Sequence, residues 1–230
     1  MIIYELKYKV FLLLPVKQED ALVRIASCID RTLLKSARWG EFHSENRYKG
    51  YSFCAPYPLS EGGYYREHQV YQILIRTVLP DLADYLAKSL PEYEDVCMKG
   101  LICEMKEIQK FHVSSMYSIT PVIVKGEKNQ YWRDNMDFLE FERQIKNNLI
   151  KKYKAFYQEE LEENFELYSY IELKNRMPIK ICYKKIHLLG DKVQLQITEH
   201  PSAQKLAFMA YAAGIGTMNQ RGYGFVNVKR

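Results

Sequence analysis

The chain has 230 residues, of which 47% are hydrophobic and 27% charged, and its formal net charge is +5. This length fits one large domain or two of about 110 residues, with enough apolar residues for a packed core. No apolar run approaches the ~20 residues of a membrane span, and five scattered cysteines without a C-x-x-C pair argue against a disulfide framework and a zinc site.

The first half of the chain alternates between strand-like and helix-like patterns. Residues 17–38 predict an amphipathic helix, because Ile25, Ile29 and Leu33 recur at steps of three and four. A polar loop that contains His43 should follow this helix. In chain order, we expect a strand at 2–15, the helix at 17–38, strands at 50–56 and 64–78, a short helix from 80, and a strand at 98–112.

The same order returns in the second half. Gly190 and Asp191 favour a tight hairpin turn into a strand whose apolar residues alternate with polar ones. Pro201 should begin a helix rich in small apolar residues. The expected elements are a strand at 117–125, a helix at 137–158, strands at 167–173, 178–188 and 192–198, a helix from 201, and a strand at 225–229.

We therefore interpret each half as β-α-β-β-α-β, which is the ferredoxin-like arrangement, with one additional strand in the second half. We predict an α+β protein made of two tandem ferredoxin-like domains. The N-terminal domain should span residues 1–114 and the C-terminal domain residues 115–230.

The positive charge is concentrated in the second half. Residues 1–114 hold 15 Lys and Arg against 15 Asp and Glu, whereas residues 115–230 hold 18 against 13. Residues 180–230 contain eight basic residues and only two acidic ones, Asp191 and Glu199. This local excess favours a polyanionic partner such as RNA, although an ordinary solvated lysine-rich surface is an equal alternative on charge alone.

A glycine-rich loop is the most specific motif of the sequence. Residues 214–225 read GIGTMNQRGYGF and lie between a predicted helix and the last predicted strand. Glycine permits backbone angles that other residues avoid and a close approach of another backbone. The order helix-loop-strand excludes a Rossmann fingerprint, and the missing Gly-Lys-Ser/Thr excludes a P-loop. A helix cap followed by a glycine-rich turn is the plainer alternative.

The spacing G-x-G-x-x-x-x-x-G-x-G at the end of a second ferredoxin-like half resembles the signature of the CRISPR-associated repeat endoribonucleases of the RAMP superfamily. The stretch YKGYSF at 48–53, placed after His43, and SITPVI at 118–123 are also similar to that family. The resemblance implies an enzyme that cuts CRISPR precursor RNA within its repeats by attack of the 2′-hydroxyl. It would leave a 2′,3′-cyclic phosphate and a 5′-hydroxyl and need neither metal nor cofactor.

His43 is the candidate acid or base, because an imidazole titrates near neutral pH and this one has polar neighbours, whereas the other four histidines lie within or beside predicted strands. Lys49 is the candidate that stabilises the phosphorane. The predicted RNA-binding residues are Lys35, Arg38, Arg47, Lys180, Lys184, Lys185, Gly214, Gly216, Asn219, Gln220, Arg221, Gly222 and Gly224. Some relatives add a tyrosine from the first helix, which has none here.

Two alternatives stay open. One is a RAMP-type subunit that binds repeat RNA without cutting it, inside a larger CRISPR ribonucleoprotein complex. The other is an unrelated ferredoxin-like enzyme that binds a small phosphorylated ligand on the glycine loop. We expect a soluble, cytoplasmic protein whose partner is CRISPR repeat RNA, without membrane association, and we leave open a homodimer and contacts with other effector-complex subunits.

Overall fold

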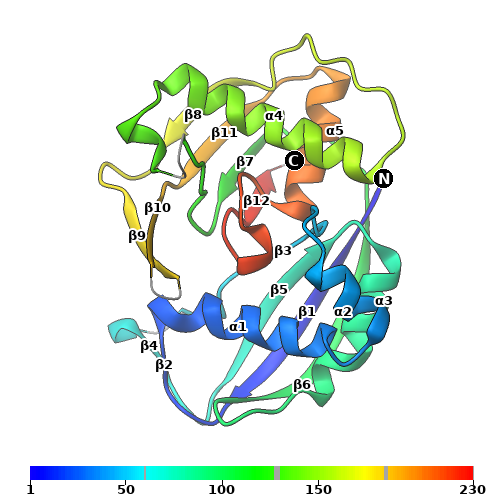
Figure 1. The fold of residues 1–230 in the computed structure, drawn as a ribbon, viewed down its shortest axis with the longest axis vertical. Coiled ribbons are helices and arrows are strands. Elements are labelled where there is room, and N and C mark those ends of the chain that lie inside the picture. Colours follow the sequence, from blue (N-terminus) through cyan, green and yellow to red (C-terminus); the bar gives the residue numbers. More distant parts are fainter. Residues whose placement is uncertain (60, 127–129, 184–185, 230) are drawn as a thin grey trace. The chain divides into compact units, whose positions relative to one another are not determined.

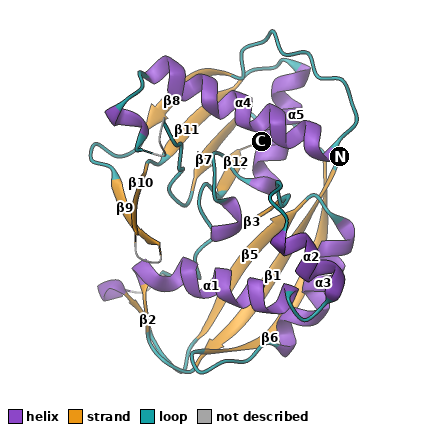
Figure 2. Ribbon diagram, viewed as in Figure 1, coloured by secondary structure: helices purple, strands orange, loops and turns teal. Residues whose placement is uncertain are grey.

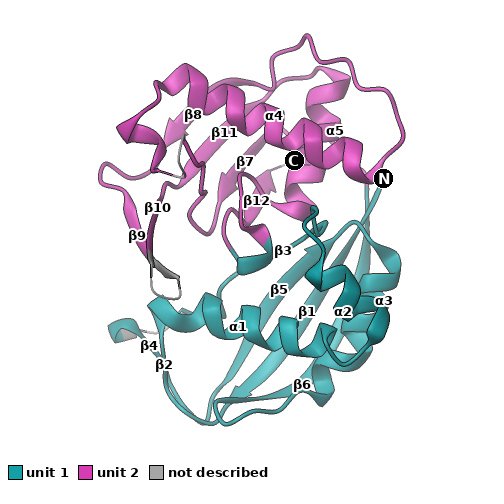
Figure 3. Cartoon of the chain, in the orientation of Figure 1, with its two compact units in different colours: residues 1–109, 220–222 teal, residues 110–219, 223–230 magenta. Residues whose placement is uncertain are grey.

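The structure is a computed structural model, and it describes residues 1–59, 61–126, 130–183 and 186–229. The chain divides into two compact units (Figure 3). Unit 1 contains Met1–Gln109 and Gln220–Gly222, and unit 2 contains Lys110–Asn219 and Tyr223–Arg230. A short piece of the glycine-rich loop therefore belongs to the N-terminal unit, although it is remote in sequence.

Unit 1 is built on a four-stranded antiparallel sheet with the order β3-β5-β1-β6 (Figure 1). Its strands are β1 (Ile2–Leu12), β3 (Tyr51–Phe53), β5 (Val70–Thr77) and β6 (Met98–Gln109). A separate two-stranded pairing joins β2 (Val16–Lys17) to β4 (Tyr64–Tyr65). The first strand thus lies in the interior of the sheet, between the third and the fourth strands of the motif.

The helices of unit 1 are α1 (Gln18–Leu33), α2 (Ala37–Ser44) and α3 (Pro80–Ser89). Alternate residues of β1, from Leu6 to Leu12, are buried together with Ile25 and Ile29 of α1 and Leu86 of α3. Period-two burial on the strand and three-to-four spacing on the helices produce one continuous core.

The helix predicted at 17–38 is in fact two helices, and His43 lies in the second helix rather than in a loop. Ser36 interrupts the first helix and caps the next one, because its hydroxyl accepts a hydrogen bond from the Trp39 amide. Trp39 and Phe42 are buried and pack edge to face, with 5.4 Å between ring centroids. Tertiary burial of two aromatic side chains therefore stabilises a helix of only eight residues.

Unit 2 repeats the motif with the sheet order β12-β7-β11-β8 (Figure 2). Its strands are β7 (Ser115–Ser118), β8 (Tyr168–Leu173), β11 (Val193–Ile197) and β12 (Val226–Lys229). The two helices are α4 (Phe138–Phe156) and α5 (Pro201–Ala213). Asp137 caps α4 through the Glu140 amide, and Pro201 begins α5 as expected.

The predicted hairpin turn at Gly190 and Asp191 is wrong. The segment before it forms a separate ribbon of β9 (Ile179–Tyr183) and β10 (Ile186–Gly190), whereas β11 pairs with β7 and β8. Asp191 is fully buried and accepts hydrogen bonds from Tyr131, Trp132, Arg133 and Asn175, at 2.6 to 2.7 Å. The backbone changes sheets at this carboxylate instead of reversing.

The strand predicted at 117–125 is also shorter than expected. It ends at Ser118, and Val122 and Ile123 make only isolated bridges, to Asp191 and to Thr217. The α+β class and the two ferredoxin-like arrangements are nevertheless confirmed by the strand orders. Within the described ranges, no helix combines the length and the apolar character that crossing a bilayer requires.

Candidate active site

His43 faces a carboxylate that the sequence analysis did not single out. Its Nδ1 lies 3.5 Å from Oδ1 of Asp30, which comes from the last turns of α1. The two side chains are about one-fifth exposed, at 22% and 21%. The aspartate is thus near enough to orient the imidazole, and the histidine keeps access to solvent.

Arg221 of the glycine-rich loop binds the other oxygen of the same carboxylate. Its Nη1 donates a hydrogen bond to Asp30 Oδ2, and only 21% of the arginine side chain is exposed. All three side chains belong to unit 1, because residues 220–222 are part of it. The structure therefore brings two predicted site residues, His43 and Arg221, together through Asp30.

A buried tyrosine lies beneath this cluster. Tyr51, on β3, is 2% exposed, and burial raises the pKa of its hydroxyl, with a further rise from the charge of Asp30. The hydroxyl is consequently held neutral and away from solvent. This position does not suit direct contact with a substrate.

Lys49 has a structural position at the end of α2. Its Nζ donates to the carbonyl oxygens of Phe42 and Glu45, the latter at 2.7 Å, and it lies 4.9 Å from the centroid of the Phe42 ring. Partial burial and the nearby charges of Arg47 and Arg221 lower the pKa of Lys49, against the opposing effect of Glu45. Lys49 thus closes the carboxyl end of the helix that carries His43.

The four glycines of the loop are buried and have positive φ angles. A Cβ on Gly224 would lie 2.0 Å from the Ile215 carbonyl oxygen, and one on Gly216 would lie 2.5 Å from that of Ile123. Gly214 would meet the Asn219 amide at 2.5 Å. These glycines permit close approach of protein backbone, as the motif predicted, and are not placed to contact RNA by themselves.

Lys152 holds the loop from inside unit 2. Its Nζ, on α4, donates to the carbonyl oxygens of Gly214 and Gly216 at 2.8 Å and to Asn219 Oδ1 at 2.6 Å. Asn219 in turn donates to two backbone carbonyls of the loop and is 6% exposed, so it braces the loop and does not present its amide to RNA. Burial lowers the pKa of Lys152 to about 7.

The sequence carries a local signal for the role of Lys152. The buried stripe of α4 runs through Phe141, Ile145 and Leu149, and Lys152 continues it three residues later. A lysine on an apolar helix face needs internal acceptors, because an unpaired buried charge is costly.

The predicted basic residues have different surroundings. Lys35 is exposed, whereas Arg38 pairs with Asp81 at 2.6 Å and lies 4.7 Å from the centroid of the Trp39 ring. Arg47 pairs with Glu45 and lies over the Phe42 ring at 4.8 Å.

In unit 2, Lys180 is exposed on β9, and Gln220 of the glycine loop is partly exposed in unit 1. Lys184 and Lys185 lie outside the described residues.

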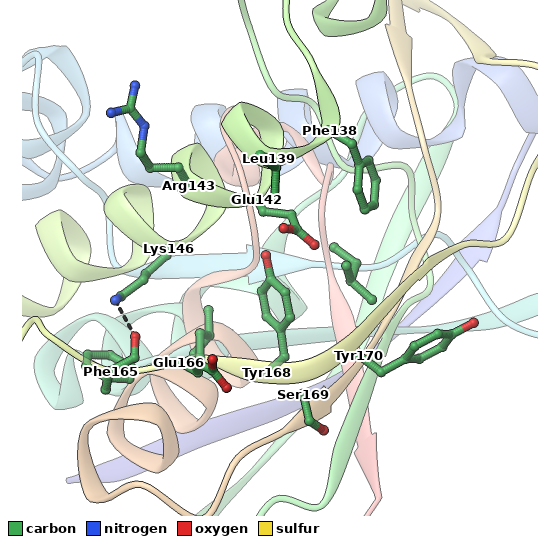
Figure 4. Close-up of a pocket in the computed structure, with 12 residues that line it drawn as sticks. Phe138, Leu139, Glu142, Arg143, Lys146, Phe165, Glu166, Tyr168, Ser169 and Tyr170 are labelled. Atoms are coloured by element: carbon green, nitrogen blue, oxygen red, sulfur yellow. Dashed lines mark hydrogen bonds between the residues drawn. The ribbon is translucent and has the colours of Figure 1, made fainter.

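An open cleft of about 580 Å³ lies between α4 and β8 in unit 2. Figure 4 shows Tyr168 and Glu142 directed into it, while Lys146 donates to the carbonyl oxygen of Phe165 at the rim. Arg143, the other cation of its lining, pairs with Glu140. No nucleophile and base converge here among the described side chains, and no group of three metal-ligating side chains occurs in the described part of the chain.

Comparison with known proteins identifies the family and the fold. The family model for the CRISPR associated protein Cas6, C-terminal, matches residues 103–228, more than half of the chain. The CRISPR-associated endoribonuclease Cas6 2 of Methanocaldococcus jannaschii is 25% identical in an alignment 213 residues long, which covers 85% of this chain and 87% of that one. Two solved structures share the fold over 99% of this chain and the whole of theirs: a CRISPR-associated protein Cas6 (TM-score 0.74, 18% identity) and a RAMP protein binding different RNA substrates (TM-score 0.71, 17% identity).

Two ferredoxin-like units with a glycine-rich loop before the last strand define a RAMP-type protein. Within this class of proteins, the matched family model identifies the family: the chain belongs to the Cas6 family of CRISPR-associated proteins. The family resemblance drawn from the sequence is confirmed.

Proposed function

We propose that this protein is an endoribonuclease that cuts CRISPR precursor RNA within each repeat and so releases guide RNAs. The observation that carries the proposal is His43, partly exposed and held against Asp30, in a chain of the Cas6 family. Its relative from Methanocaldococcus jannaschii is named an endoribonuclease, and a structural neighbour of the same fold is described as binding RNA.

The proposed reaction uses the nucleophile that RNA itself carries. The 2′-hydroxyl loses its proton and its oxygen bonds to the adjacent phosphorus, while the bond from phosphorus to the 5′-oxygen breaks and that oxygen gains a proton. The products are a 2′,3′-cyclic phosphate and a 5′-hydroxyl. The step needs acid–base help and no redox partner, and we propose that it proceeds without a metal ion.

His43 supplies that proton transfer in our proposal. Its Nδ1 faces Asp30, so Nε2 is the ring nitrogen that meets the reacting oxygens. Acid–base catalysis by a positioned side chain is typically worth about 10² to 10⁴ in rate, which sets the expected loss when the imidazole is removed. Lys49 supports His43 by fixing the carboxyl end of α2, the helix that carries the histidine, and it places its positive charge at that helix end.

RNA binding is proposed to use the exposed cations instead of the buried glycines. Lys35 in unit 1 and Lys180 in unit 2 are exposed, and Arg47 is more than half exposed. Phosphate contacts by such residues release counterions, so affinity should fall steeply as salt is raised.

The test is a gel assay of repeat-containing RNA in excess EDTA. It compares the wild-type protein, His43→Ala, and a substrate with a 2′-deoxy sugar at the cut. His112→Ala is the matched control, because this half-exposed histidine pairs with Glu199 on the surface of unit 2. We expect cleavage at one site by the wild type and the control, and its loss with His43→Ala and with the deoxy substrate.

Each other outcome has a definite meaning. Tight binding without cleavage would favour a non-catalytic RNA-binding subunit. Cleavage only after Mg²⁺ is restored would contradict the metal-free reaction. Full activity of His43→Ala would move the chemistry to another residue.

A further inference from the structure

The Asp30 carboxylate has two different environments on its two oxygens. Oδ2 accepts a hydrogen bond from Arg221. Oδ1 is buried and accepts no hydrogen bond from the described residues, and the His43 ring nitrogen lies 3.5 Å away from it. An acceptor of this kind is costly to leave unpaired, and a contraction of a few tenths of an ångström would bring the histidine N–H within bonding distance.

Such a contact has a chemical consequence for the imidazole. A carboxylate is an acceptor only, so it pairs with the tautomer that carries its proton on Nδ1. That choice leaves Nε2 as the nitrogen with a lone pair. Hydrogen bonds of catalytic groups are often long before the substrate binds and shorten in the complex.

Arg221 is brought to Asp30 by the glycine that follows it. Gly222 has φ +87°, and a Cβ there would lie 2.7 Å from Leu22 on α1 and 2.7 Å from Phe53 on β3. The loop backbone therefore packs directly on these two elements of unit 1. This close contact places the Arg221 guanidinium beside the last turns of α1.

We propose that Asp30 is the positioning residue of His43, and that Arg221 of the glycine-rich loop holds Asp30 in place. The inference rests on the proposed role of His43 in cleavage. It gives the loop a second task, which is to fix the tautomer and the direction of the catalytic imidazole. Asp30 and Arg221 act through the histidine and need not touch the scissile phosphate.

The first measurement is the tautomer of His43 by ¹⁵N–¹H NMR of the full-length protein without RNA, with His43→Ala identifying the resonances. We expect the Nδ1–H form in the wild type. In Asp30→Asn, Arg221 keeps its acceptor oxygen, so the new amide turns its NH₂ group toward Nδ1 and selects the Nε2–H form. In Asp84→Asn, the same change on the exposed side of α3, the wild-type tautomer should persist.

The second measurement is single-turnover cleavage at saturating protein, together with the Kd for repeat RNA. For histidines that bind metals, loss of the partner that orients the ring typically costs about 10- to 100-fold in affinity or activity, and we take the same range for His43. We expect that loss of rate for Asp30→Asn and Arg221→Met, with the Kd of Asp30→Asn unchanged. Arg221→Lys should recover part of the rate, because it retains a cation for Oδ2.

The outcomes separate this inference from the proposed function. If the wild type cuts and His43→Ala does not, an unchanged tautomer and rate in Asp30→Asn would overturn the positioning role alone. If the wild type does not cut, the catalytic part of the inference fails with the proposed function, whatever the tautomer. A changed tautomer with a slower rate and an intact Kd would support it.

Discussion

Replacing Lys152 by Met removes the donor that ties the glycine-rich loop to α4. Met fills nearly the same volume, but the three oxygens of Gly214, Gly216 and Asn219 lose their hydrogen bonds. Each buried acceptor without a partner costs about 1–3 kcal/mol. The variant no longer desolvates an ammonium group, which offsets part of this cost. We expect a net loss of about 2–4 kcal/mol at neutral pH.

Urea unfolding followed by tryptophan fluorescence measures this loss. The chain has two tryptophans, so a Trp39→Phe background leaves buried Trp132 as the reporter of unit 2. A drop of that size corresponds to roughly 5–15 °C in Tm for a chain of this length. The control is Lys151→Met, because Lys151 is the exposed neighbour on the same helix. Equal midpoints for the two variants would refute the assigned role of Lys152.

The difference in stability between the wild type and Lys152→Met should change with pH in a definite direction. Because the pKa of Lys152 is about 7 in the folded protein and near its ordinary 10.5 when unfolded, the unfolded chain holds an extra proton between these values. Wild-type stability should rise with pH in this window, by up to about 1.4 kcal/mol per pH unit. The difference between wild type and Lys152→Met should therefore widen from pH 7 to pH 9, and a constant difference would contradict this linkage.

Two further predictions concern stability. Gly224→Ala should cost more than about 2 kcal/mol of stability, because its Cβ would meet the Ile215 carbonyl oxygen at 2.0 Å. The control is Gly63→Ala, at a similar φ but in open space, which should cost about 1 kcal/mol. Equal Tm shifts for the two variants would contradict this explanation. Asp191→Ala removes a buried carboxylate that accepts hydrogen bonds from one buried donor, on Trp132, and from three part-buried donors. It should lose about 3–5 kcal/mol, seen as early unfolding at Trp132, while a loss under 1 kcal/mol would show that the network is dispensable.

The repeated β-α-β-β-α-β order was predictable because it follows from local patterns. Apolar spacing predicted α1, α3, α4 and α5, and alternation predicted the strands that pair in each sheet. The break at Ser36 was missed, since the apolar spacing did not exclude a continuous helix and the burial of Trp39 that favours α2 is tertiary. The turn at Gly190 was wrong for a related reason, because Asp191 is held by side chains remote in sequence.

The candidate site was predictable only in part. His43 and Arg221 were named from a motif, but their connection through Asp30 spans 191 residues of sequence and has no local pattern. One local signal existed: an acidic residue near the carboxyl end of a helix is disfavoured by the helix dipole, so Asp30 needed a compensating charge. Lys152 gave a similar local signal, because a lysine on the apolar face of α4 requires internal hydrogen-bond acceptors.

Unit 1 is not a continuous piece of chain, and this limits how the protein can be divided. A chain ending at Gln109 would contain Asp30 and His43 but lack Arg221, which the last eleven residues supply. The N-terminal half is therefore not an independent module that recombination could transfer with its histidine site intact. A circular permutation that links residue 230 to residue 1 and opens the chain elsewhere would keep these three residues in one polypeptide, whereas separate expression of the halves would not.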